Sequence, residues 1–248
     1  MIGNNLPESL NDVKKYAAIT LLSATLVGCD NNSAPLSFTP EMASFSNEFD
    51  FDPLRGPVKD FTQTLFNEKG EVSKRVTGTV STEGCFDTLE LHDLEANTSV
   101  ALVLDANYYL DAETQQRKVK LQGKCQLAEL PSAGVTWDTD DNGFVVAAHG
   151  KEMEVKYRYD ADGYPLGKTT VSGDQHLSVQ STPSKDLRKR MDYSAVSMLN
   201  DKPLGNVTQS CDYDRHNNPV SCDLTITDDS VKPAVEHKYT IKNTIEYY

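Results

Sequence analysis

Apolar side chains recur at every second position through most of the chain after Phe61. The alternation is clear at residues 119–121, 153–159, 220–226 and 235–241, where charged or hydroxyl side chains fill the positions between. A period of two places one face of a strand on a core and the other in water, as in antiparallel sheets. The sequence therefore predicts an all-β protein, built mainly from antiparallel hairpins in a curved sheet, a sandwich or an open barrel.

Three segments depart from this alternation. Residues 100–104 are continuously apolar and predict a more central strand. Residues 30–60 begin as a polar stretch and then interleave phenylalanines with acidic residues and prolines. We expect them to lie on the domain surface in irregular form, with the phenylalanines against the edge of the core. The one candidate for a helix is a weak stripe around residues 187–199.

One turn pattern repeats along the chain, at residues 64–71, 137–144, 157–165 and 211–219. Each copy has an apolar or aromatic strand end, then Asp or Asn, two residues, and Gly or Asn. The Asp or Asn side chain can bond the turn backbone, and Gly or Asn adopts a positive φ at low cost. The copies resemble the YD-type repeats of bacterial surface proteins, but their irregular spacing predicts shared hairpin chemistry without a long solenoid.

The N-terminal segment has the features of a bacterial lipoprotein signal. Lys14 and Lys15 precede an apolar stretch, residues 16–26, which is too short to span a bilayer and ends in Val-Gly before Cys29. Residues 1–12 are polar and do not fit this pattern, so we place the natural start at Val13.

These features predict three parts of the chain: a signal peptide at 1–28, a lipidated tether at 29–40 and a single β-rich periplasmic domain at 41–248. Cys29 is expected to become an N-palmitoyl, S-diacylglycerol cysteine. Asp30 and Asn31 follow it and resemble the sorting signal that retains lipoproteins in the inner membrane. The expected location is therefore the periplasmic face of the inner membrane, with the outer membrane as the alternative.

Four cysteines remain after lipidation, and an even number in an oxidising compartment predicts two disulfides. Cys211 and Cys222 flank a segment that is symmetric about residues 216–217, so a hairpin turning there would place them opposite each other. Cys85 and Cys125 are then left to pair. A zinc site is the alternative, but the short Cys-x-x-Cys spacing that such sites favour is absent.

Candidate chemistry in the sequence is sparse. Asp138–Gly143 matches the first half of a calcium loop, but His149 occupies the twelfth position, where a bidentate Glu is needed. Carboxylate pairs such as Asp50/Asp52 and Asp140/Asp141 are compatible with glycoside hydrolysis, yet 37 acidic residues make such pairs common by chance. The five histidines are scattered without metal spacing, at His92, His149, His176, His216 and His237. We predict no metal, no cofactor and no enzymatic activity.

The net charge of −13 disfavours nucleic acid and anionic membrane surfaces as partners. No long apolar stretch follows the signal, so the lipid on Cys29 is the only membrane attachment that the sequence predicts.

Three long stretches, residues 36–61, 121–134 and 239–245, resemble the YnfC family of bacterial lipoproteins. The resemblance covers essentially the whole chain after the signal. It implies a lipid-anchored envelope protein of enteric-type bacteria, lipidated at the position of Cys29. The family carries no catalytic or ligand-binding residues to transfer.

The leading functional hypothesis is a non-enzymatic envelope lipoprotein that binds another envelope protein or stabilises an assembly. The alternative is a binding module for a small apolar or cationic ligand on the concave face of the sheet, and a cell-wall hydrolase is the third. A flat exposed aromatic patch would favour the first, and a deep apolar pocket with a few polar groups the second. Converging titratable groups with perturbed pKa values would favour the third.

Overall fold

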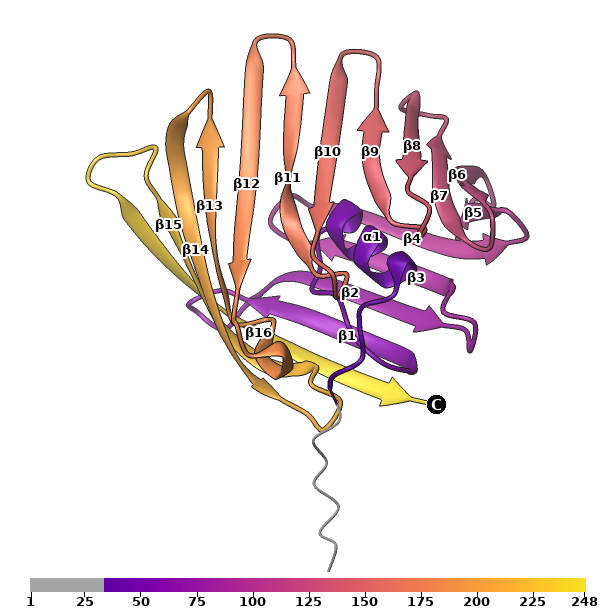
Figure 1. Ribbon diagram of the computed structural model, residues 1–248, viewed down its shortest axis with the longest axis horizontal. Helices are drawn as coiled ribbons and strands as arrows, with labels where there is room; N and C mark the ends of the chain where they lie inside the picture. Colours follow the sequence, from indigo (N-terminus) through magenta and orange to yellow (C-terminus); the bar gives the residue numbers. More distant parts are fainter. Residues whose placement is uncertain (1–33) are drawn as a thin grey trace, which may run out of the picture. The chain divides into compact units, whose positions relative to one another are not determined.

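The computed structural model describes residues 34–248, so Cys29, Asp30 and Asn31 lie outside the described part of the chain. That part contains one α-helix, one short 3-10 helix and a series of strands (Figure 1). The helices are α1 (Pro40–Phe49) and η1 (Leu187–Lys189). The strands are β1 (Val58–Phe66), β2 (Val72–Val80), β3 (Phe86–Asp93), β4 (Thr98–Asp105), β5 (Tyr108–Asp111), β6 (Arg117–Gln122), β7 (Gln126–Leu130), β8 (Val135–Thr139), β9 (Val145–His149), β10 (Met153–Tyr159), β11 (Pro165–Ser172), β12 (Gln175–Pro183), β13 (Tyr193–Leu199), β14 (Lys202–Tyr213), β15 (Pro219–Asp228) and β16 (Val235–Tyr247).

The strands form one closed antiparallel barrel. Each strand pairs with its neighbours in sequence, and β1 closes the barrel against β16, with Phe61 opposite Ile245 and Leu65 opposite Ile241. The prediction of an all-β, antiparallel fold is confirmed. The strands are joined into a closed barrel, where the sequence left a curved sheet, a sandwich and an open barrel as alternatives.

The four repeated turns have the predicted chemistry. The side-chain oxygens of Asn67, Asp140, Asp160 and Asp214 each accept hydrogen bonds from the backbone N–H groups two and four residues later. The third residue after each has a positive φ, between 62° and 90°. Because the same turn shifts the register of each hairpin by one residue, one local motif sets several of the hairpins.

The α1 helix corrects the expectation of an irregular surface stretch. Thr39 is its N-cap, with Oγ1 accepting a bond from the Met42 N–H at 3.3 Å, and Pro40 occupies the first turn. The helix ends at Asp50, which adopts the left-handed conformation at φ 58°. Thr39-Pro40-Glu41 is an N-terminal helix signal that the prediction passed over. No helix among residues 34–248 is long and apolar enough to cross a bilayer.

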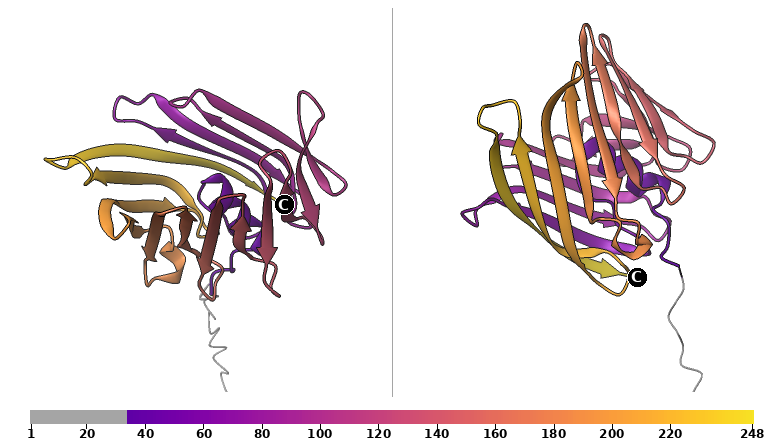
Figure 2. Two further views of the ribbon diagram at one scale, coloured as in Figure 1. Left: turned by 90° about the horizontal axis from the view of Figure 1, so that it is seen from above. Right: turned by 60° about the vertical axis from the view of Figure 1, so that its left-hand side comes forward.

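The α1 helix lies inside the barrel, between the N-terminal strands and the middle strands (Figure 2, left). Phe45 is 1% exposed and stacks on Phe86 of β3 with ring centroids 4.8 Å apart. On the other side, Ser44 Oγ accepts a bond from the Val145 N–H of β9 at 3.0 Å. A barrel of this many strands encloses more space than its own side chains fill, and the helix fills part of it.

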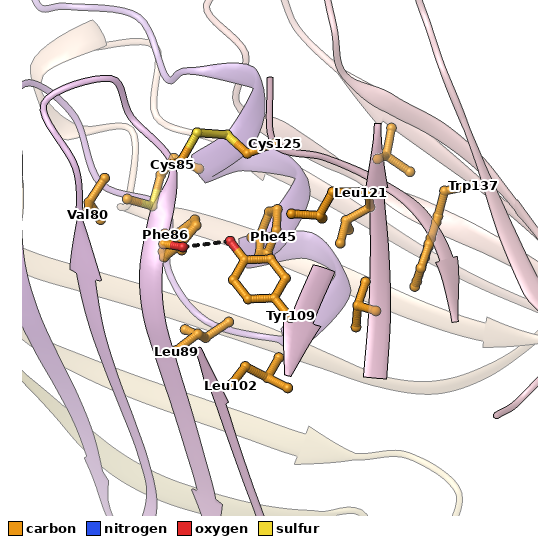
Figure 3. Packing of buried hydrophobic residues seen from close by; sticks show 14 of the residues in the cluster. Phe45, Val80, Cys85, Phe86, Leu89, Leu102, Tyr109, Leu121, Cys125 and Trp137 are labelled. Atoms are coloured by element: carbon orange, nitrogen blue, oxygen red, sulfur yellow. Dashed lines mark hydrogen bonds between the residues drawn. A yellow bond between two sulfur atoms is a disulfide. The ribbon is translucent and has the colours of Figure 1, made fainter. Parts of the chain in front are cut away.

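The main hydrophobic core lies between α1 and strands β1 to β10 (Figure 3). Tyr109 of β5 is fully buried beside Phe45, and its hydroxyl donates to the Phe86 carbonyl at 2.8 Å. Cys85 and Cys125 form a disulfide at the edge of this core. Strands β11 to β16 contribute few residues to it, so this half of the barrel is less filled.

The predicted helical stripe at residues 187–199 is wrong. Only Leu187–Lys189 forms a 3-10 turn, and Tyr193–Leu199 is β13. In β13, Ala195 is buried and its neighbours Ser194 and Val196 are exposed. The segment therefore follows a period of two, which a search for helical spacing does not detect.

Candidate ligand-binding cavity

A cavity of about 380 Å³ lies inside the less filled half of the barrel. It is bounded by the C-terminal end of α1, by residues 50–53, and by inward-facing side chains of β1, β2 and β11 to β16. We call it the interior cavity. Its apolar lining comes mainly from Phe51, Pro53, Leu65, Val76, Val179, Met191, Ala195, Val207, Leu224 and Ile241.

A group of charged and amide side chains lies among these apolar residues. Its members are Asp50 and Asp52 after α1, Lys74 of β2, Lys168 of β11 and Gln209 of β14. Two elements position the acids. The left-handed turn at Asp50 ends the helix, and the Gln63 side chain of β1 then bonds both the N–H and the carbonyl of Asp52, at 2.9 and 2.6 Å.

Asp50 forms an ion pair with Lys74. Lys74 Nζ lies 3.0 Å from its carboxylate and 2.6 Å from its carbonyl. The Asp50 side chain is 91% exposed because it projects into open space. Its protein surroundings act to raise its pKa by desolvation, but the charge and hydrogen bond of Lys74 hold that pKa below its usual value.

Asp52 makes no ion pair with any of residues 34–248. Its carboxylate accepts one bond, from the neutral amide Nε2 of Gln209, at 3.1 Å. Desolvation raises its pKa to about 6; the Gln209 bond opposes this rise, the negative charge of Asp50 adds to it, and the positive charge of Lys74 opposes it. The neighbouring carboxyls thus have pKa values displaced in opposite directions.

Gln209 is 4% exposed and holds Asp52 in place. Its Nε2 also donates to the Met191 carbonyl at 3.1 Å, while its Oε1 is buried and has no hydrogen-bond partner. Tyr164 and Tyr193 complete this part of the lining. Desolvation raises the pKa of both hydroxyls, and the negative charge of Asp52 raises them further.

The four cysteines predicted to form disulfides lie outside the interior cavity, and Cys29, Asp30 and Asn31 are outside the described residues. The structure contains both predicted disulfides: Cys85–Cys125 joins the β2–β3 and β6–β7 turns, and Cys211–Cys222 links paired positions of β14 and β15. Neither pair lines the interior cavity.

Among the carboxylate pairs noted in the sequence, Asp50 and Asp52 reach the interior cavity. Asp140 instead bonds its own turn, and His149 pairs with Asp138 at 2.9 Å across β8 and β9. These flanking strands replace the helices of an EF-hand. Within residues 34–248, no three His, Cys, Asp or Glu side chains are grouped to hold a metal. Lys74 and Gln209 were not predicted, because each is an unremarkable residue in an alternating strand.

Comparison with known proteins identifies the family. The sequence profile of UPF0257, an uncharacterised protein family, matches residues 13–248. The chain belongs to this family. Proteins named UPF0257 lipoprotein YnfC from Salmonella dublin and Salmonella typhi are 70% identical to it over 236 residues, which cover 95% of this chain and all of theirs. The resemblance to the YnfC family is confirmed.

Two solved structures overlap the fold at a low level. A porin-like protein from Bacteroides uniformis has a TM-score of 0.37 and 10% identity, covering 76% of this chain and 96% of its own. The MucA/MucB complex of Pseudomonas aeruginosa has a TM-score of 0.21 and 11% identity, covering 83% of this chain and 92% of the matched chain. Overlaps this weak carry no inference about the interior cavity.

Proposed function

We propose that this protein is a lipid-anchored lipoprotein of the bacterial envelope whose barrel binds a small, largely apolar molecule in the interior cavity. The observation that carries the proposal is the cavity itself, with apolar walls from eight strands and a few polar side chains at the end of α1. A concave apolar site with a small number of placed polar groups is the usual form of a small-molecule site.

The surface offers less support for protein binding. Among residues 34–248, Tyr248 is the one aromatic in the set of clearly exposed large hydrophobic residues. The others are aliphatic and come from many different elements, among them Val100, Val171 and Val220. Single exposed aliphatics are normal on any protein. The interior cavity therefore favours the ligand-binding alternative over the docking hypothesis that led from sequence.

Catalysis also has less support than binding. Asp50 and Asp52 are neighbouring carboxyls whose pKa values are shifted in opposite directions, which is the feature expected of a hydrolase site. However, a glycosidase needs both carboxyl groups free to face one bond, and Asp50 is held by Lys74 at its carboxylate and at its carbonyl.

Partly filling the interior cavity should weaken ligand binding. Ala195 is buried in β13 and lines the cavity, so Ala195→Leu places three more heavy atoms in it. We expect the uncharged fluorescent probe N-phenyl-1-naphthylamine to bind the unaltered chain and to bind Ala195→Leu at least about tenfold more weakly, because overpacked sites cost about 1–3 kcal/mol. Fluorescence titration measures both affinities.

Ser194→Leu is the matched control. Ser194 is the neighbouring residue and is exposed, so the variant adds the same side chain outside the barrel. It should bind the probe as the unaltered chain does. Equal binding by all three proteins would place the probe outside the interior cavity, and no binding by any would count against the proposed function.

The anchoring part of the proposal rests on the signal before Cys29 and on the lipoprotein name that the relatives carry. Cys29→Ser should abolish lipidation, which intact-mass measurement detects. Asp30→Ser should move the protein from the inner-membrane to the outer-membrane fraction of a density gradient. Finding the unaltered protein already in the outer membrane would remove the sorting role of Asp30 and Asn31 and leave the lipidation of Cys29 standing.

A further inference from the structure

We propose that the interior cavity selects molecules with a primary ammonium group, bound by the carboxylate of Asp52, with the apolar part of the ligand against Val207, Leu224 and Ile241. This inference rests on the proposed function and adds the chemical class of the ligand. It starts from the balance of charged groups in the cavity.

Asp52 and Lys168 are the two charged groups of the interior cavity that make no ion pair within residues 34–248, but Lys168 lies at the C-terminal end of α1, where the helix dipole favours a cation. Lys74 bonds Asp50, and Lys168 Nζ donates to the Asn47 carbonyl at the C-terminal end of α1, at 3.2 Å. Asp52 has one neutral donor, from Gln209. A carboxylate removed from water is stable when it is paired and hydrogen-bonded, and an ammonium group would supply both the charge and the donors.

Gln209, beside Asp52 in the same wall, has no donor left to offer. Gln209 is 4% exposed and lines the cavity, and its Oε1 has no partner. Its amide hydrogens go to Asp52 and to the Met191 carbonyl. Buried polar atoms without a partner are uncommon in native proteins. Gln209 therefore has no amide hydrogen left for a second bond to Asp52, so any stronger partner of this carboxylate must come from a ligand.

The remaining neighbours are compatible with a cation. Tyr164 and Tyr193 line the cavity on the β11 and β13 side, and the charge of Asp52 affects the pKa of both hydroxyls. Aromatic rings beside a carboxylate favour an ammonium group. An anionic ligand is disfavoured, because Lys74 and Lys168 are already engaged and Asp52 would repel it.

The affinity for an ammonium ligand should depend on pH. Asp52 is faced by Asp50, Lys74, Gln209 and the two tyrosines, and its pKa is raised to about 6. Its carboxylate is therefore ionised at pH 7.5 and mostly protonated at pH 5. Because the protonated form attracts no cation, the affinity should fall about tenfold between these values, while the affinity for an uncharged ligand should not follow this fall.

The experiment compares three molecules of equal length: octylammonium, octanol and octanoate. Each competes with N-phenyl-1-naphthylamine on the mature chain carrying Cys29→Ser, so that no detergent is needed. We expect octylammonium to bind about tenfold or more tightly than octanol, since hydrogen bonds to charged groups are the stronger ones, and octanoate to bind most weakly.

Asp52→Asn tests the assignment to this residue. It should reduce the difference between octylammonium and octanol to less than about threefold, and an unchanged circular dichroism spectrum shows that the variant is folded. The raised pKa means that ionised Asp52 is less favourable in the folded than in the unfolded chain, so the variant should be at least as stable at pH 7.5. Asp52→Glu keeps the charge and should keep the preference.

Asp212→Asn is the matched control, because it removes the same charge from an exposed position of β14. It should leave the preference for octylammonium unchanged. Equal affinity for octylammonium and octanol on the unaltered chain would overturn the ammonium site and leave the cavity as a ligand site. A preference that survives Asp52→Asn would also overturn the inference, and failure of all three molecules to bind would count against the proposed function as well.

Discussion

Phe45→Ala is expected to lower the free energy of unfolding by about 3–5 kcal/mol, the range for removing a large buried aromatic. Phe45 is the residue of α1 that packs on Phe86 and Tyr109 inside the barrel. Its ring stacks on the Phe86 ring with centroids 4.8 Å apart and meets the Tyr109 ring edge-on with centroids 5.7 Å apart. Truncation would leave a void, and the side chains around it cannot move in to fill it because the closed barrel fixes their strands. Urea unfolding followed by Trp137 fluorescence measures the loss, since Trp137 lies in the same core.

Phe66→Ala is the matched control. Phe66 ends β1, is only partly buried, and has Lys242 Nζ 5.7 Å above its ring. Its truncation should cost about 1–2 kcal/mol, because part of its surface stays in contact with water and the loss is smaller than for a fully buried ring. Equal losses from the two substitutions would show that α1 is not part of the stabilising core.

Removing the Cys85–Cys125 disulfide is expected to cost about 4 kcal/mol. The bridge closes a sequence separation of 40 residues, and in the chain-entropy model the stabilisation grows with the length of the closed loop. Both cysteines are buried, so Cys85→Ala with Cys125→Ala also loses contacts in the core. Guanidinium unfolding of the double variant measures the change.

The pair Cys211 and Cys222 provides the comparison. Its sequence separation is 11, and the paired strands β14 and β15 already hold the two residues opposite each other. The double alanine variant should lose about 2–3 kcal/mol and still fold. A larger fall in the free energy of unfolding for this pair than for Cys85 and Cys125 would contradict the expectation that the bridge with the longer loop stabilises the chain more.

The strands could be predicted because the pattern of apolar and polar residues that marks each one lies within the strand itself. The alternation at residues 153–159 and 235–241 follows from one buried and one solvated face, and the turns around Asp160 and Asp214 follow from side-chain bonds within five residues. Barrel closure was not predictable, because the pairing of β1 with β16 joins opposite ends of the domain and leaves no local pattern.

The helix was missed for a different reason. Phe45, Phe49 and Phe51 are interleaved with acidic residues, which suggested an irregular surface stretch, yet Thr39 and Pro40 form a recognisable helix start. An isolated helix of this length is marginal in water. Inside the barrel it is stabilised by contacts on two sides, from Phe86 and from the Val145 N–H.

The interior cavity could not be predicted, because its polar residues come from distant parts of the chain. Asp52 follows the helix and Gln209 lies far along the sequence, and only the closed barrel places them 3.1 Å apart. The pair Asp50/Asp52 was visible in sequence, but its meaning depends on Lys74, which forms an ion pair with Asp50 and none with Asp52. Asp52, the carboxylate of the cavity without an ion pair, then becomes the most informative group of the site.

The most direct test of the central claim is a crystal structure of the mature chain with 8-bromooctylammonium, located by the anomalous signal of bromine. The account predicts a bromine peak inside the barrel beside Val207, Leu224 or Ile241, which line the interior cavity, with the ammonium nitrogen within hydrogen-bond distance of Asp52. A bromine peak confined to the outer surface, with the interior cavity holding only water, would contradict it.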